Sequence, residues 1–181
     1  MPKATSSGGG RTFQAAPAGV HQAVCVDVVD LGLVEVTWQG QTKRQHKVSL
    51  RWQIDEARDD GKPFLVSKRY TLSLSDRATL RRDLEAWRGR PFTDADLRDG
   101  FEVDDVLGAN CLVNIVHRTK DGTTYANVDA IMPLVKGMPK LVARDYVMQR
   151  DRTDAAPPSP TQPADDAHDY DPPPLDDEIP F

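Results

Sequence analysis

Hydrophobic and polar residues alternate in two stretches near the middle of the chain, which is the pattern of strands with one buried face. The first stretch is HKVSLRWQI (46–54) and the second is FLVSKRYTLSL (64–74). The residues Asp59 to Pro63 between them contain an Asp-Asp-Gly sequence that is typical of turns. The pattern therefore predicts two neighbouring strands, and the polar QGQTKR (39–44) before them predicts a loop.

A valine-rich region precedes these strands and is interrupted by one glycine. HQAVCVDVVDL (21–31) and LVEVTW (33–38) flank Gly32. This arrangement suits either a hairpin or one long strand that bends at a glycine bulge. We favour the bent strand.

The hydrophobic period changes to that of a helix in SDRATLRRDLEAWRG (75–89). The apolar residues at helical spacing are Leu80, Leu84 and Trp87. Ser75 or Asp76 is expected to cap the first turn, and Gly89 is expected to end the helix. The following residues, 92–108, predict a short helical turn and a loop.

A second hairpin is predicted near the end of the patterned region. CLVNIVHRT (111–119) and TYANVDAIM (124–132) flank Lys120-Asp121-Gly122, and Asp-Gly between alternating runs favours a tight turn. Three strands, a helix and two strands are the order of elements in an OB barrel. We therefore predict an all-β fold with one helix, as a five-stranded OB-fold barrel plus disordered termini.

The composition of the ends predicts the domain organisation. Residues 1–17 are rich in Gly, Ser and Ala and predict a flexible N-terminal arm. Residues 18–152 hold the OB-fold domain. Residues 153–181 are acidic and proline-rich, so they bury too little apolar surface to offset their ordering entropy and are expected to be disordered.

The charges are unevenly distributed along the chain. The formal net charge is −5, but eight of the 28 acidic residues and none of the 23 basic residues lie in residues 153–181. The remaining body is therefore mildly cationic, with 23 basic and 20 acidic residues. A cationic body beside an anionic tail indicates that the tail competes with an anion that the body binds, although a merely solubilising tail gives the same pattern.

Signals for a metal site, a cofactor or catalysis are absent from the sequence. The four histidines and two cysteines have no metal-ligand spacing, and no phosphate-binding glycine loop or nucleophile motif occurs. Asp104 and Asp105 lack the partner that a two-metal nuclease site needs. Cys25 and Cys111 lie in apolar stretches, as in a reducing compartment. Without a signal peptide or membrane-spanning run, we expect a cytoplasmic protein that is not an enzyme and needs no cofactor.

Basic and aromatic residues lie together on the predicted strands and loops. Single-strand binding without sequence preference needs cations for phosphates and rings on which bases stack. The candidates for DNA binding are Lys43, Arg44, Lys47, Arg51, Trp52, Lys68, Arg69, Tyr70, His117, Arg118, Lys120 and Tyr125. A solvated strand face is the other explanation for the cations.

Each aromatic ring has a core alternative. Trp52 shares a face with three aliphatic residues, which favours core packing over base stacking. Trp87 lies on the helix stripe and is expected in the core. Tyr70 and Trp38 fit both environments. Tyr125, which we expect opposite His117 near the hairpin tip, is the ring best placed for a ligand.

The last six residues carry a recognisable motif. Asp176, Asp177, Glu178, Ile179, Pro180 and Phe181 resemble the acidic tip of bacterial single-stranded DNA-binding proteins, in which several aspartates precede Ile-Pro-Phe. In that family the tip docks on replication, recombination and repair enzymes. The resemblance implies that Phe181 would enter an apolar pocket while the acids and the carboxylate meet basic residues of the partner.

The body resembles a different group. YTLSLSDRATLRRDLEAWRGRPF (70–92) and LGANCLVNIVHRTKDGTTYANV (107–128) are similar to phage and prophage single-stranded DNA-binding proteins with one OB fold, over roughly residues 20–135. The resemblance implies a protein that coats single-stranded DNA in phage replication or recombination. The alternative is an OB-fold adaptor of a replisome without DNA affinity. Homo-oligomerisation stays open, because an edge strand such as residues 33–38 can pair between chains.

Overall fold

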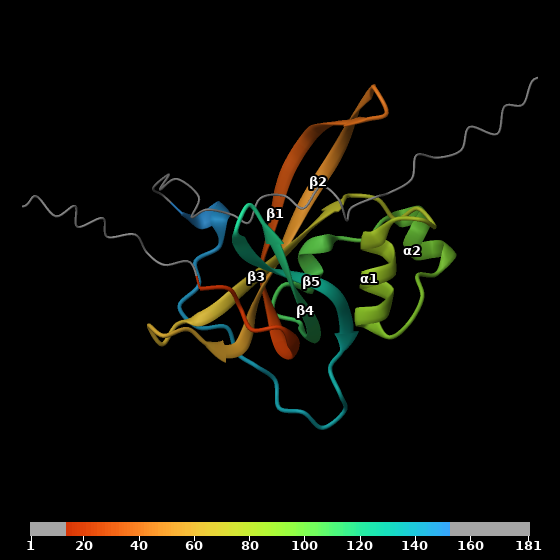
Figure 1. The fold of residues 1–181 in the computed structure, drawn as a ribbon. Helices are drawn as coiled ribbons and strands as arrows, with labels where there is room; N and C mark the ends of the chain where they lie inside the picture. The colour runs from red at the N-terminus through yellow and green to blue at the C-terminus, as the bar shows by residue number, and fades with distance from the viewer. Residues whose placement is uncertain (1–13, 153–181) are drawn as a thin grey trace, which may run out of the picture.

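The computed structural model describes residues 14–152, so the predicted acidic tail and most of the predicted N-terminal arm lie outside the described residues. Five antiparallel strands form one sheet in the order β3-β2-β1-β4-β5. They are β1 (Gly19–Trp38), β2 (Gln41–Ala57), β3 (Pro63–Thr71), β4 (Asn110–Lys120) and β5 (Thr123–Pro133). The edge strands β3 and β5 contact each other, so the sheet curls into a barrel (Figure 1). The predicted all-β, OB-like fold is confirmed.

Helices follow β3, as predicted. Helix α1 (Thr79–Arg88) is followed by the short α2 (Asp94–Asp99) and by a 3₁₀ turn, η1 (Val103–Val106). Gly89 ends α1 in the left-handed conformation, with φ 67°. The predicted cap at Ser75 or Asp76 is wrong, because the N-cap residue is Ala78 and no side chain caps it. Asp76 precedes the helix and instead accepts a hydrogen bond from Arg81 in the first turn.

The first strand is a single bent strand, as favoured by the sequence. β1 runs for 20 residues, and its register with β2 shifts between Asp30 and Gly32, where Gly32 has φ 68°. The predicted polar loop at residues 39–44 is wrong. Gln39 and Gly40 alone form the turn, both with positive φ, which matches the twist of a two-residue hairpin, and β2 already begins at Gln41.

The barrel interior is filled from all five strands and from α1. The rings of Trp52 and Trp87 lie 6.1 Å apart, and both residues are buried. Leu80 and Leu84 of α1 are also buried in this core, as the helical period predicts. Ala16 belongs to the core as well, with 4% of its surface exposed. The predicted flexible arm is therefore wrong at its C-terminal end, because residues 14–17 lie against the barrel.

A long segment without strands follows β5 and crosses the barrel. We call residues 134–152 the strap; it starts at the end of β5 and runs past the barrel to the side away from α1 and α2 (Figure 1). Two side-chain amides hold its backbone: Gln53 exchanges hydrogen bonds of 2.6 and 2.8 Å with Arg144, and Asn110 exchanges bonds of 3.0 and 2.7 Å with Leu141. The strap has no periodic sequence pattern, because single polar side chains hold it in place, and it was therefore not predicted.

Candidate nucleic-acid interface

The β1–β2 hairpin projects beyond the barrel as a two-stranded arm (Figure 1). We call residues 33–45 the arm. β4 pairs with β1 only from Gly19 to Val24, and β3 pairs with β2 only from Lys47 onward. Within residues 14–152, neither edge of the arm is paired with a further strand.

A polar cluster fixes the base of the arm at the bulge in β1. The Asp30 carboxylate accepts a hydrogen bond from the backbone N–H of Gly32 at 2.7 Å and contacts His46 Nε2 at 2.6 Å. The backbone hydrogen bond, followed by the His46 contact, lowers the pKa of Asp30 below its ordinary value. These contacts tie the bend in β1 to β2 and so set the direction of the arm.

The arm separates its two cations onto opposite faces. Opposed residues of an antiparallel pair share a face, and successive residues alternate between faces. Lys43 lies opposite Val36 and Arg44 lies opposite Glu35, so the two cations point to different sides. Arg44 forms an exposed ion pair with Glu35 at 3.4 Å, whereas Lys43 makes no ion pair within residues 14–152.

Lys47 and Arg69 come together on the outer face of β2 and β3. Arg69 lies opposite Ser49, and Lys47 is two residues from Ser49 on the same face. Lys47 Nζ donates to Thr71 Oγ1 at 2.9 Å. Arg69 is exposed and has no ion pair among the described residues. Arg69 is therefore the accessible cation of this part of the predicted site, whereas Lys47 is half-buried.

The strap covers Arg51, which we had predicted either to contact DNA or to lie on a solvated strand face. Its guanidinium donates to Gln149 Oε1 at 2.7 Å and lies 3.7 Å from the carboxylate of Asp27, with 14% of the Arg51 side chain exposed. Asp27 also accepts hydrogen bonds from Tyr146 Oη at 2.7 Å and from the Gln149 N–H at 3.0 Å. Arg51 thus binds the strap, and the prediction that its side chain is exposed is wrong.

The Lys68 side chain extends toward α1 and β5, where the barrel closes, and lies on the opposite side of β3 from Arg69. Its Nζ lies 2.7 Å from Asp83 Oδ2 of α1 and 3.2 Å from the backbone oxygen of Asp129 in β5. Tyr70 Oη donates to the same Asp83 oxygen at 3.0 Å. Adjacent strand residues face opposite sides, so the prediction that Lys68 joins Arg69 in a DNA-binding surface is wrong.

Two aromatic residues of the predicted site are core residues. Trp52 and Tyr70 each have 0% of their surface exposed. A base cannot reach either ring without opening the barrel, so their assignment to base stacking is wrong. The alternation of β2 explains the burial of Trp52, which follows Val48 and Leu50 on the inner face.

The β4–β5 hairpin presents the remaining candidates. Asp121 and Gly122 have φ of 51° and 78°, which confirms the predicted tight turn. Arg118 lies directly opposite Tyr125, and Lys120 is exposed at the tip. The expected pairing of Tyr125 with His117 is wrong.

His117 belongs to a different surface from Tyr125. It lies opposite Ala126, a core residue, and its Nε2 contacts the backbone oxygen of Ala16 at 2.7 Å. The cross-strand register, shifted by a bulge between Asn114 and Ile115, sets these neighbours. The hairpin therefore groups Arg118, Lys120 and Tyr125 but leaves His117 in contact with the N-terminal segment.

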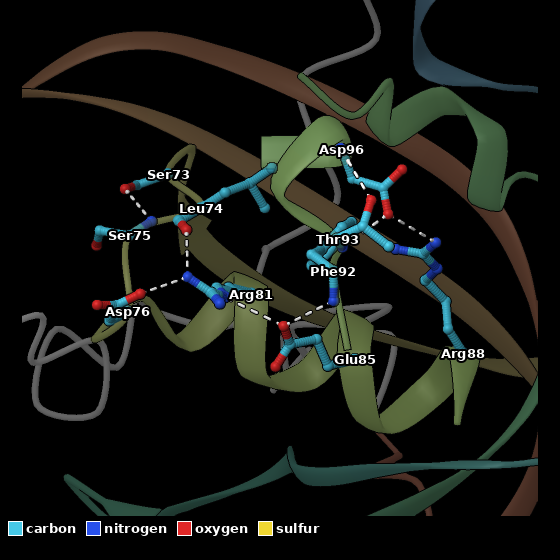
Figure 2. Close-up of polar contacts among 10 residues, drawn as sticks. All are labelled: Ser73, Leu74, Ser75, Asp76, Arg81, Glu85, Arg88, Phe92, Thr93 and Asp96. Carbon is cyan, nitrogen blue, oxygen red and sulfur yellow. Dashed lines mark hydrogen bonds and ion pairs between the residues drawn. The ribbon is translucent and has the colours of Figure 1, made fainter. Parts of the chain in front are cut away.

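The arginines of α1 take part in intramolecular contacts instead. Figure 2 shows Arg81 bridging Asp76 and Glu85, and Glu85 accepting a 3.0 Å hydrogen bond from the backbone N–H of Phe92. Arg88 lies 3.5 Å from Asp96, whose carboxylate completes a capping box with Thr93 at the start of α2. These contacts join α1 to α2 and leave the strands and hairpins as the main candidates for the interface.

The Glu85 contacts predict a measurable pH dependence of stability. The hydrogen bond from Phe92, followed by that from Arg81, lowers the pKa of Glu85 below its ordinary value of 4.5. The stabilisation is therefore present above about pH 4.5 and is lost as the pH falls through the lowered pKa. We expect Glu85→Gln to lower the melting temperature near neutral pH, and the gap to the parent protein to narrow in acid. Thermal circular dichroism checks this, with Glu56→Gln as an exposed control; a pH-independent gap contradicts it.

Other kinds of site find little support in the described residues. Within residues 14–152 no group of three or more His, Cys, Asp or Glu side chains could hold a metal ion, and no helix is long and apolar enough to cross a membrane. Burial raises the pKa of Cys25 to about 12, so its thiol stays protonated. The predicted partner-binding tip, residues 176–181, lies outside the described residues.

Comparison with known proteins identified no relative of this chain. No protein-family model matches the chain, and a search of curated proteins found no significant match.

Proposed function

We propose that this protein binds single-stranded DNA without sequence specificity and coats it during phage DNA replication or recombination. The observation that carries the proposal is the presence of accessible cations and an exposed ring on the strands and hairpins of an OB-like barrel. Lys43, Arg69 and Lys120 make no ion pair within residues 14–152, and Trp38 has 54% of its surface exposed. Phosphates and unstacked bases are the ligands that such side chains suit.

The acidic tail supplies the second part of the proposal. Its last residues, 176–181, resemble the tip with which bacterial single-stranded DNA-binding proteins recruit other enzymes. We propose that the tip recruits replication, recombination or repair enzymes in the same way. The eight tail acids are also a competitor for the cationic surfaces of the barrel.

An adaptor without DNA affinity is the second candidate. The observation that favours it is the exposure of apolar side chains on one face of the arm, where Val34 has 39% and Trp38 has 54% of its surface exposed. An exposed apolar patch is typical of a protein interface. The adaptor function predicts that no form of the chain binds DNA.

Removal of the tail distinguishes these functions. We expect a chain ending at Arg152 to bind labelled oligo-dT more tightly than the full-length chain, because eight competing negative charges are gone. Fluorescence anisotropy at low and moderate salt measures both affinities, and both should fall as salt rises. Equal affinities would refute competition by the tail. No binding by either chain would refute the DNA-coating function and favour the adaptor.

A further inference from the structure

The two faces of the arm differ in composition. One face carries Leu33, Glu35, Thr37, Thr42 and Arg44, and the other carries Val34, Val36, Trp38, Gln41, Lys43 and Gln45. On the first face Arg44 Nε lies 3.4 Å from Glu35 Oε1, so the two charges offset each other. The second face, which we call the Trp38 face, has one cation and no acid.

The register makes Trp38 and Lys43 diagonal neighbours on the Trp38 face. Trp38 lies opposite Gln41, next to the two-residue turn, and Lys43 lies opposite Val36 on the same face. Trp38 is exposed, in contrast to the buried Trp52 and Trp87. An accessible indole offers a flat surface for a base, while a nearby ammonium group can contact the phosphate that follows it.

Charge favours a nucleic acid over a second copy of the chain as the occupant. Two copies of the Trp38 face brought together would place two Lys43 side chains in one interface without an acid on either face. A single DNA strand brings phosphates to Lys43 and unpaired bases to Trp38. Duplex DNA keeps its bases stacked, so the indole has no free base to contact.

We propose that the Trp38 face of the arm is a base-stacking surface for single-stranded DNA, in which Trp38 stacks on a base and Lys43 contacts the adjacent phosphate. This inference rests on the proposed function. It assigns a role to Trp38, for which the sequence allowed both core packing and base stacking. A tryptophan directly before a polar turn was the available signal, because the strand around it has no buried face. Arg44, only one residue from Lys43, lies outside this surface.

Four single substitutions in the full-length chain, one of them a control, test the assignment. We expect Trp38→Ala to weaken oligo-dT binding about 5-fold to 100-fold, as loss of one stacked base does. Trp38→Phe should recover part of the loss. Lys43→Ala should weaken binding and reduce the salt slope by about 0.7, as for one phosphate contact on a single strand. Arg44→Ala is the matched control, since it removes one cation from the same arm and should change affinity less.

Tryptophan fluorescence gives an independent readout. Because Trp52 and Trp87 are buried, oligo-dT should quench chiefly the emission of Trp38, and Trp38→Phe should abolish most of the quenching. Circular dichroism confirms that each variant is folded.

The outcomes separate this inference from the function on which it rests. If the unsubstituted chain does not bind oligo-dT, both are overturned. If it binds and Trp38→Ala binds equally well, only the base-stacking surface is overturned. Sedimentation measures whether the chain forms a dimer. If it does, and if Trp38→Ala dissociates the dimer without loss of DNA affinity, the Trp38 face binds a second copy of the chain and the base-stacking surface is contradicted.

Discussion

Replacing Asp83 by alanine is expected to destabilise the protein by about 3 to 5 kcal/mol, because the change leaves a buried cation without its partner. Lys68 Nζ lies 2.7 Å from the Asp83 carboxylate, and only 18% of the Lys68 side chain and 9% of the Asp83 side chain are exposed. The substitution also removes the acceptor of the Tyr70 hydroxyl, which is fully buried. The three residues join α1 to β3, and Lys68 reaches on to β5.

Urea unfolding followed by circular dichroism measures this effect. The control is the double replacement of Asp83 by Leu and Lys68 by Met, which removes both charges and should recover much of the lost stability. A loss below about 1 kcal/mol for Asp83→Ala would mean that Lys68 finds solvent or another partner, as in surface ion pairs. That result would contradict the role of this cluster in closing the barrel.

Replacing Trp52 by alanine is expected to cost about 3 to 5 kcal/mol, as for other buried large-to-small substitutions. The indole is fully buried against Trp87, at a ring separation of 6.1 Å. Trp52→Phe should cost much less, because it keeps an aromatic ring and removes an indole N–H that has no hydrogen-bond partner among the described residues.

DNA affinity decides whether Trp52 acts only as a core residue. Trp52→Phe should leave oligo-dT binding unchanged while lowering stability modestly. Trp38→Ala should instead weaken oligo-dT binding and leave stability unchanged. Parallel unfolding and anisotropy measurements on the two variants test this contrast. A stable Trp52→Phe variant with strongly reduced DNA affinity would place the ring in the interface and contradict its burial.

The alternation of residues predicted the strands but not the extent of the arm. Residues 46–54 alternate because one face packs in the barrel, and the predicted inner residues Val48, Leu50, Trp52 and Ile54 are buried. Ser49 and Gln53 of the other face are buried too, which the alternation did not predict. Gln41 to Arg44 continue the same strand without a buried face, so their polar sequence resembles a loop. The turn at Gln39 and Gly40 also lacks the Asn-Gly or Asp-Gly pair that marks such hairpins most clearly.

The sequence predicted which residue types form the candidate site, but it did not predict which of these residues lie close together in the structure. Lys68 and Arg69 are adjacent in sequence, yet one closes the barrel and the other faces solvent. Arg51 has the right phase for an outer face, but the strap that covers it comes from residues about a hundred positions later. Long-range contacts of this kind leave no local signal, so only the three-dimensional structure separates structural cations from accessible ones.

The binding of single-stranded DNA is tested most directly by competition. Full-length protein bound to labelled oligo-dT at low salt should be displaced by unlabelled single strands of mixed sequence about as well as by oligo-dT, and far less by the corresponding duplex. This result would support an interface that contacts phosphates and unstacked bases without reading sequence. Failure to bind oligo-dT at low salt, or equal displacement by duplex and single strand, would contradict the account.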